Sequence, residues 1–204
     1  GAGVGGGSLV YANTLYVPPT EFFQDPQWAG ITDWERELAP YYDQASRMLG
    51  VEDVPRRSPL DETFAEVAED MGVGDTFRLT PVGVFFGAPA GVTVPDPYFG
   101  GVGPDRAGCR ECGECMTGCR HNAKNTLPKN YLGLAEKAGA VVHPLTTVTS
   151  VSERAGGGFV VETVRTGPLT RPATTYTADQ VIVAAGTFNT QKLLHEMRDT
   201  GRLP

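Results

Sequence analysis

The chain has 204 residues, of which 40% are hydrophobic and 20% charged, and its formal net charge at neutral pH is −7. These values are typical of a globular chain that buries a sizeable core, and they leave no basic patch for nucleic acid. No apolar run approaches the roughly 20 residues that a membrane-spanning helix needs. We therefore expect a globular protein with no nucleic-acid partner and no transmembrane segment.

The chain opens on a glycine-rich stretch, with five glycines among its first seven residues, followed by Ser8 and an apolar run. Glycine tolerates positive φ and lets another group approach the backbone, although it loses much entropy on folding. The stretch therefore favours a loop against a large cofactor, in which the N–H groups of Gly5, Gly6, Gly7 and Ser8 bind phosphate or ring acceptors. A flexible linker is the alternative, since Gly/Ser composition is typical of linkers.

The same stretch indicates that the chain is a piece of a longer protein. A dinucleotide fingerprint follows a strand, but no strand can precede Gly1, and the first methionine is Met48. A signal peptide could not be seen in such a piece. We expect a cytoplasmic protein, with a secreted or cell-surface location as the alternative.

A first helix is predicted after the glycine loop. Thr32 or Asp33 caps its start, apolar residues recur at helical spacing, and Gly50 closes it. Pro40 is expected to break or kink this helix near its middle.

A second helix is predicted to begin after Pro59 and to end at Gly72, and short strands are expected at 77–79 and 82–86. A large apolar ligand needs a mostly apolar and aromatic wall. Four aromatic residues in or near these strands could supply such a wall, namely Phe85, Phe86, Tyr98 and Phe99. The favoured interpretation is that they belong to an ordinary hydrophobic core.

All the cysteines of the chain are Cys109, Cys112, Cys115 and Cys119, in the spacing C-x2-C-x2-C-x3-C. This spacing matches the bacterial ferredoxin run, except that Arg120 stands where proline usually follows. An iron–sulfur cluster is one interpretation, but in two-cluster ferredoxins the fourth cysteine serves a different cluster. Structural zinc is less favoured because it prefers two separated pairs. Metal-free thiols or disulfides that pin a loop stay open.

The last third of the chain predicts a helix followed by an antiparallel hairpin. The helix follows a turn within 122–138, and a β-rich run covers 141–151. Glycines at 156–158 then turn the chain, so that a strand at 159–164 precedes its partner at 171–177.

Residues 181–187 form a short, continuous apolar run that ends in small residues. Continuous apolarity is typical of a parallel strand covered on both faces. Ligands of such sheets bind at the carboxyl ends of strands, so Ala185, Gly186 and Thr187 are expected to face a cofactor. The helix from Thr190 points its N-terminal dipole the same way. A generic α/β strand-to-helix junction is the alternative.

Several passages resemble the glucose-methanol-choline (GMC) flavoprotein oxidoreductases, and they occur in that family's order. They are the glycine loop at 3–10, which is similar to that of the family's sterol oxidases, and residues 123–132, 147–151, 181–190 and 199–204. Two residues depart from the family pattern, because Tyr11 stands at the usual asparagine and Ala2 at a frequent arginine.

The resemblance implies that the chain takes part in binding FAD. It implies cofactor contacts from the glycine loop at the start of the chain, from the small residues that end the apolar run 181–187, and from Val148, whose backbone meets the adenine. The residues concerned are Gly5, Gly6, Gly7, Ser8, Val148, Ala185, Gly186 and Thr187. It further implies an oxidoreductase that acts on a sterol or another hydrophobic alcohol. In that chemistry a base removes the proton of the 3β-hydroxyl, the C3 hydride passes to flavin N5, and oxygen or another acceptor reoxidises the flavin.

The family's catalytic histidine and asparagine belong to a region beyond Pro204. We therefore expect no catalytic residue in this chain and expect His143 and His195 to be structural. The isolated chain should have little or no turnover.

These expectations combine into an α/β fold, part of a Rossmann-like FAD-binding domain with an inserted α+β substrate-binding region. Residues 1–17 would be an FAD-binding loop segment, 18–122 a substrate-domain segment with the cysteine-rich loop, and 123–204 the second FAD-binding segment. The alternatives are a flavin alcohol dehydrogenase with an iron–sulfur relay, and an inactive truncated module.

Overall fold

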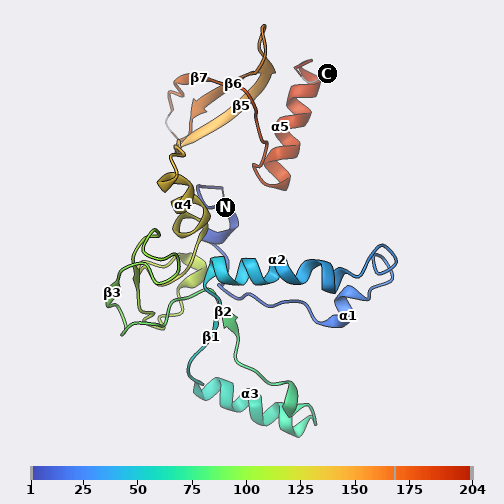
Figure 1. Ribbon diagram of the computed structural model, residues 1–204, viewed down its shortest axis with the longest axis vertical. Helices are drawn as coiled ribbons and strands as arrows, with labels where there is room; N and C mark the ends of the chain where they lie inside the picture. Colours follow the sequence, from blue (N-terminus) through green and yellow to red (C-terminus); the bar gives the residue numbers. More distant parts are fainter. Residues whose placement is uncertain (1, 168, 203–204) are drawn as a thin grey trace. The chain divides into compact units, whose positions relative to one another are not determined.

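The computed structural model describes residues 2–167 and 169–202 and divides the chain into two compact units, Gly1–Ala140 and Val141–Pro204. Helices and small antiparallel sheets make up both units (Figure 1). Within the described residues, no helix combines the length and the apolar character that crossing a bilayer requires.

Helix α2, Trp34–Leu49, follows the short helix α1, Thr20–Phe23, in the first unit. The carboxylate of Asp33 accepts a hydrogen bond from the N–H of Arg36 at the start of α2, and Gly50 ends the helix at φ 55°. The predicted caps are therefore confirmed.

The expected break at Pro40 does not occur, since α2 runs through this residue without interruption (Figure 1). Both ends of the helix are held by contacts from residues outside it. The indole of Trp34 donates to the carbonyl of Trp28 at 2.9 Å, and the side chain of Asn130 donates to the carbonyl of Met48 at 2.9 Å. Such tertiary contacts offset the cost of an internal proline, about 3 kcal/mol.

Helix α3, Pro59–Asp70, begins with a capping box. Ser58 accepts from the N–H of Asp61, and the Asp61 carboxylate accepts from the N–H of Ser58. Proline at the first helical position costs little because its missing N–H would be unpaired there. The structure therefore confirms this helix, which is followed by a 3-10 turn, η2, at Gly74–Thr76.

The strands of the first unit are two residues long. Strand β1, Glu52–Asp53, pairs antiparallel with β2, Pro81–Val82, and β3, Thr93–Val94, pairs antiparallel with β4, Arg106–Ala107. The strand predicted at 77–79 does not form, and of the strand predicted at 82–86 only Val82 lies in a named strand.

The core of the first unit gathers around Val82, Val84 and Ala123. The N–H of Phe85 donates to the carbonyl of Ala123 at 2.9 Å, and the N–H of Cys109 donates to the carbonyl of Phe85 at 2.9 Å. Phe85 is buried, and its ring packs edge-on against Tyr98 with the ring centroids 5.9 Å apart. Phe85 thus belongs to the core, as the favoured interpretation expects, whereas Phe86, Tyr98 and Phe99 are only partly buried.

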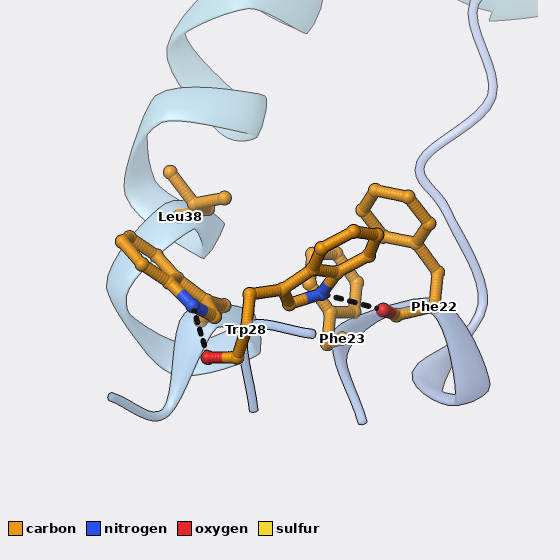
Figure 2. Close-up of a pocket in the computed structure, with 5 residues that line it drawn as sticks. Phe22, Phe23, Trp28 and Leu38 are labelled. Atoms are coloured by element: carbon orange, nitrogen blue, oxygen red, sulfur yellow. Dashed lines mark hydrogen bonds between the residues drawn. The ribbon is translucent and has the colours of Figure 1, made fainter. Parts of the chain in front are cut away.

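Aromatic side chains from α1, α2 and the loop between them line an open apolar pocket of about 250 Å³ (Figure 2). The lining residues are Phe22, Phe23, Trp28, Trp34 and Leu38. The indole N–H of Trp28 donates to the carbonyl of Phe22 at 2.9 Å, and that of Trp34 is also bonded internally. The polar atoms of both indoles are therefore satisfied within the protein.

The second unit holds a three-stranded antiparallel meander and one helix (Figure 1). The strands are β5, Thr146–Glu153, β6, Phe159–Arg165, and β7, Ala173–Ala178, in the order β5-β6-β7. Helix α5, Thr187–Asp199, packs against β5 and buries Met197. The predicted hairpin partner of β6 is thus confirmed, whereas 141–145 are not in a strand.

The parallel strand predicted at 181–187 is wrong for the described residues. Residues 181–185 have no regular structure, and Ile182 is 90% exposed. Every pairing between named strands in the described part of the chain is antiparallel. A strand needs a neighbour to bond its N–H and C=O groups, and no described strand lies beside this run.

Candidate functional site

The glycine-rich stretch folds into a tight turn that continues as a 3-10 helix, η1, Gly6–Leu9. The N–H of Gly6 donates to the carbonyl of Gly3 at 2.9 Å, and the N–H of Ser8 donates to the carbonyl of Gly5 at 3.2 Å. Of the four N–H groups expected to be available to a ligand, those of Gly6 and Ser8 are thus used inside the turn. Among the described residues, the N–H groups of Gly5 and Gly7 have no acceptor.

The turn is fixed against Leu127 and Pro128. The hydroxyl of Ser8 donates to the carbonyl of Gly5 at 2.6 Å and accepts from the N–H of Leu127 at 2.9 Å. Gly5 has φ 105°, and a Cβ there would lie 2.6 Å from Cδ of Pro128. Gly7 is exposed, and a Cβ there would meet no atom within 4 Å. Glycine at 5 is therefore required by the fold itself, whereas Gly7 faces open space.

Lys124 joins the segment after the glycine turn to the cysteine loop. Its side chain is 1% exposed, and its ammonium donates to the carbonyls of Leu9, Tyr11 and Cys115 at 3.2, 2.7 and 2.8 Å. The ammonium also lies 4.5 Å from the centroid of the Tyr11 ring, a cation–π contact. The Tyr11 hydroxyl donates to the carbonyl of Asn125 at 2.7 Å, and burial, with the nearby Cys115 thiol, raises the pKa of Tyr11 to about 12.

Arg106 and Asn125 extend this buried polar network. The guanidinium of Arg106 donates to the side chain of Asn125 and to the carbonyl of Lys129, both at 2.8 Å, and the amide of Asn125 donates to the carbonyl of Leu49 at 2.8 Å. The Lys129 ammonium donates to the carbonyl of Lys124 at 2.8 Å, and burial, reinforced by the charge of Arg106, lowers the pKa of Lys129 to about 8.

Carboxylates are missing from this network. Within the described residues, Arg106, Lys124 and Lys129 form no ion pair with an Asp or Glu. Buried cations held by neutral groups are costly, because desolvation is not balanced by an opposite charge. The network therefore concentrates positive charge beneath the glycine turn and the cysteine loop.

Sequence reasoning did not single out Arg106, Asn125 or Asn130, all of which are buried. Charged and amide residues are mostly exposed, so their burial could not be expected from the sequence. Only the membership of 123–132 in a family-like passage pointed toward this segment.

The cysteine loop carries four free thiols. Cys109, Cys115 and Cys119 are partly buried against the core, and Cys112 is exposed. Burial raises the pKa values of the Cys109 and Cys115 thiols. Burial opposes ionisation of Cys119 as well, but backbone N–H groups of the returning chain hold its pKa below the ordinary value. The disulfide alternative is therefore not formed in this structure.

A second set of ligand types lies in the same loop. Single donor atoms of Cys112, Glu114 and His121 lie within 4.8 Å of one another. The Glu114 carboxylate also forms an ion pair with Arg120 at 3.2 Å.

The remaining predicted cofactor residues lie in the second unit. Val148 is 40% exposed on β5, pairs with Thr163, and precedes a bulge in the β5–β6 register. Gly186 precedes α5 with φ 80°, Thr187 is the first residue of the helix, and the N–H of Ala185 donates to the hydroxyl of Thr190 at 3.0 Å. Because the structure places these residues and the glycine turn in different units, their meeting at one FAD stays a prediction.

Neither histidine of the second unit has a partner typical of proton transfer among the described residues. His143 is exposed and packs on Tyr176, with the tyrosine oxygen 3.4 Å from Nδ1 of the imidazole. His195 is exposed on α5. The structural role expected for both histidines stays a prediction.

Residues 100–197 match the family model of the GMC oxidoreductases. The matched region includes the cysteine loop, the Lys124 network, the antiparallel meander and most of α5. Residues 100–197 of the chain therefore belong to the GMC oxidoreductase family.

The chain is similar to curated proteins over 95% or more of its length. It is 63% identical to a cholesterol oxidase of Mycobacterium tuberculosis, over 100% of this chain and 36% of that protein. It is 44% identical to a cholesterol oxidase of Acinetobacter baumannii, over 100% of this chain and 38% of that protein. An uncharacterised GMC-type oxidoreductase of M. tuberculosis is 28% identical over 95% of this chain and 27% of its own length. The chain thus spans about a third of the length of these relatives.

Proposed function

We propose that this chain is a segment of a longer FAD-dependent oxidoreductase that oxidises the 3β-hydroxyl of a sterol with oxygen as the acceptor. The observation that carries the proposal is the 63% identity to a cholesterol oxidase over the full chain. In this proposal the chain contributes FAD contacts and part of the substrate cover. The proton-transfer residues belong to the rest of the protein.

The glycine turn fits a large anionic cofactor. Gly5 and Gly7 keep N–H groups that no described residue accepts, and the space beside Gly7 is open. The N-terminus of α5 at Gly186 and Thr187 is exposed, and the end of a helix of this length favours anionic groups. Gly5, Gly7, Gly186 and Thr187 would hold FAD, together with the backbone of Val148. The cofactor, when bound, supplies the hydride acceptor.

A Rossmann-like domain interrupted by a substrate-binding region is part of the same proposal. The segment 1–17 would belong with 123–204, and 18–122 would be the insertion. The hydrogen bond from Leu127 to Ser8 and the packing of Pro128 on Gly5 support this division, because they tie the first segment to the start of the third.

The cofactor and the reaction can be tested on the whole protein. The purified protein should contain one FAD and form hydrogen peroxide with cholesterol, but not with the 3α-epimer of the same sterol. Absence of flavin would refute the proposal. Oxidation of the sterol by an artificial acceptor without formation of peroxide would instead identify a dehydrogenase.

A matched pair of glycine variants tests the cofactor turn. Gly7 and Gly30 both lack positive φ, and a Cβ at either position would meet no atom within 4 Å. Both Gly7→Val and Gly30→Val should therefore keep the thermal stability of the apoprotein. We expect only Gly7→Val to lose FAD, as measured by flavin fluorescence after denaturation. Equal flavin content in the two variants would show that Gly7 does not contribute to FAD binding.

A further inference from the structure

The cysteine loop leaves and re-enters the core at neighbouring backbone positions. At its start, the N–H of Cys109 donates to the carbonyl of Phe85 at 2.9 Å. At its end, the carbonyl of Ala123 accepts from the N–H of Phe85 at 2.9 Å. The backbone of Phe85 is therefore hydrogen-bonded to both ends of the loop. This pairing brings the chain after Cys119 back close to Cys109.

Three of the four cysteine side chains also lie at the core of the first unit. Cys109, Cys115 and Cys119 pack against one core cluster, formed by Val82, Val84 and Ala123. The N–H of Glu111 donates to the sulfur of Cys109 at 3.3 Å. In two-cluster ferredoxins the fourth cysteine of such a run serves a different cluster. In this fold Cys119 instead packs against the same core cluster as Cys109 and Cys115.

The separation of the sulfur atoms argues against a zinc site made of these four cysteines. Tetrahedral zinc with sulfur ligands at about 2.3 Å brings its sulfur atoms to about 3.8 Å from one another. Within the described residues, no three of the four sulfur atoms lie within 4.8 Å of one another. A cubane cluster binds each cysteine to a different iron atom, and it therefore needs the thiolates farther apart.

The buried ammonium of Lys124 lies beside the cysteine loop, where a bound anion would stabilise it. The Lys124 ammonium is 1% exposed and donates to the carbonyl of Cys115 at 2.8 Å, and no described carboxylate pairs with it. A buried ammonium is stable when an opposite charge lies close to it. Four thiolates around an iron–sulfur core carry net negative charge and would supply that charge.

We propose that Cys109, Cys112, Cys115 and Cys119 bind one [4Fe–4S] cluster, with Lys124 as the buried counter-charge. This site is separate from the residues assigned to FAD. It does not depend on the proposed sterol oxidation.

The test uses the whole protein, expressed and purified under argon. We expect about four iron and four acid-labile sulfide per chain, and an EPR spectrum of a reduced cluster after addition of dithionite. FAD is quantified separately by fluorescence, so that failure of the flavin proposal and failure of the cluster proposal are distinguishable. Stoichiometric zinc without iron, or no metal at all, would overturn the inference.

Two sets of variants separate the cluster from a mononuclear site. Cys109→Ser, Cys115→Ser and Cys119→Ser should lose the iron and the EPR signal. Glu114→Gln and His121→Ala should keep both, because these side chains belong to the alternative group around Cys112. The control within the loop is Met116→Leu, since Met116 is 65% exposed. Loss of metal in the Glu114 and His121 variants, with retention in the cysteine variants, contradicts the cluster.

Alkylation of the unmodified protein keeps the test independent of variants that fail to fold. Cys112 is exposed, so a free thiol there would react with iodoacetamide. In the argon-purified protein we expect all four cysteines to be protected until the protein is unfolded with a chelator present. Rapid labelling of Cys112 in the native protein would contradict cluster binding.

Discussion

The hydroxyl of Ser8 accepts a hydrogen bond of 2.9 Å from the backbone N–H of Leu127, a residue 119 positions further along the chain. The same hydroxyl donates to the carbonyl of Gly5 at 2.6 Å. One small side chain therefore closes the glycine turn and attaches it to the family-like passage that begins at Ala123.

Replacing Ser8 should loosen this attachment. Ser8→Ala leaves the N–H of Leu127 without its acceptor, and we expect the free energy of unfolding to fall by about 1 to 3 kcal/mol. Chemical denaturation of the whole protein measures the change. The control is Ser152→Ala, at a partly buried position of β5. Equal stability of the two variants would show that the Ser8 contact contributes little.

Gly5→Ala should be more damaging than Gly7→Ala. At Gly5 the new methyl would lie 2.6 Å from Pro128 and force an L-residue to adopt φ 105°, whereas at Gly7 it meets nothing within 4 Å. Strain of this kind costs on the order of 1 to 3 kcal/mol. We expect a lower melting temperature only for Gly5→Ala, measured by scanning calorimetry. A normal melting temperature for that variant would mean that the turn shifts away from Pro128 without cost.

Lys124→Met should destabilise the first unit strongly. The change removes the ammonium from three carbonyl groups, those of Leu9, Tyr11 and Cys115, and leaves these acceptors buried without a donor. We expect a loss of about 3 kcal/mol or more. Lys192→Met is the matched control, since the Lys192 side chain is 61% exposed. Denaturant titration compares the two, and a small effect at Lys124 would contradict the network.

Asp96 should make stability depend on pH in the acid range. Its burial opposes ionisation, but N–H donors from Tyr98, Gly103, Phe99 and Gly101 hold the pKa of the carboxyl below its ordinary value of 3.8. The folded state therefore binds fewer protons than the unfolded state near that pH. The stabilisation from Asp96 is complete above pH 3.8 and is lost as pH falls toward the lower folded-state value.

The variant Asp96→Asn removes this dependence. We expect it to be less stable than the unmodified protein near neutral pH, with the difference shrinking in acid. Thermal unfolding across the acid range measures both proteins, and Asp43→Asn, at an exposed position of α2, is the control. If the stability difference between the two proteins does not change with pH, the N–H donors around the Asp96 carboxylate do not lower its pKa.

Local features of the fold could be predicted from the sequence because their chemistry is local. Asp33 and Gly50 bound α2 through contacts with residues next to them in the chain. The pairing of β6 with β7 follows from the alternation in residues 159–164, and the glycines at 156–158 turn the chain from β5 into β6. Pro40 was misjudged because the contacts that hold α2 together come from residues far along the chain, Asn130 among them.

The candidate site was less predictable for the same reason. The glycine density around Gly5 indicated a close approach, but not that Pro128 is what approaches. The charges of Arg106 and Lys124 gave no sign that both side chains are buried, because burial depends on carbonyl groups supplied by distant segments. The cysteine spacing suggested metal ligation, but only the fold places Cys119 with the others.

The exposed run 181–185 has a practical consequence for handling this polypeptide. Its side chains are all uncharged and apolar, and Ile182 is 90% open to solvent. Unpaired backbone in such a run is a template for pairing between copies. Preparations of the separate chain should therefore precipitate as they are concentrated, and a charged substitution such as Ile182→Lys should delay the onset of turbidity.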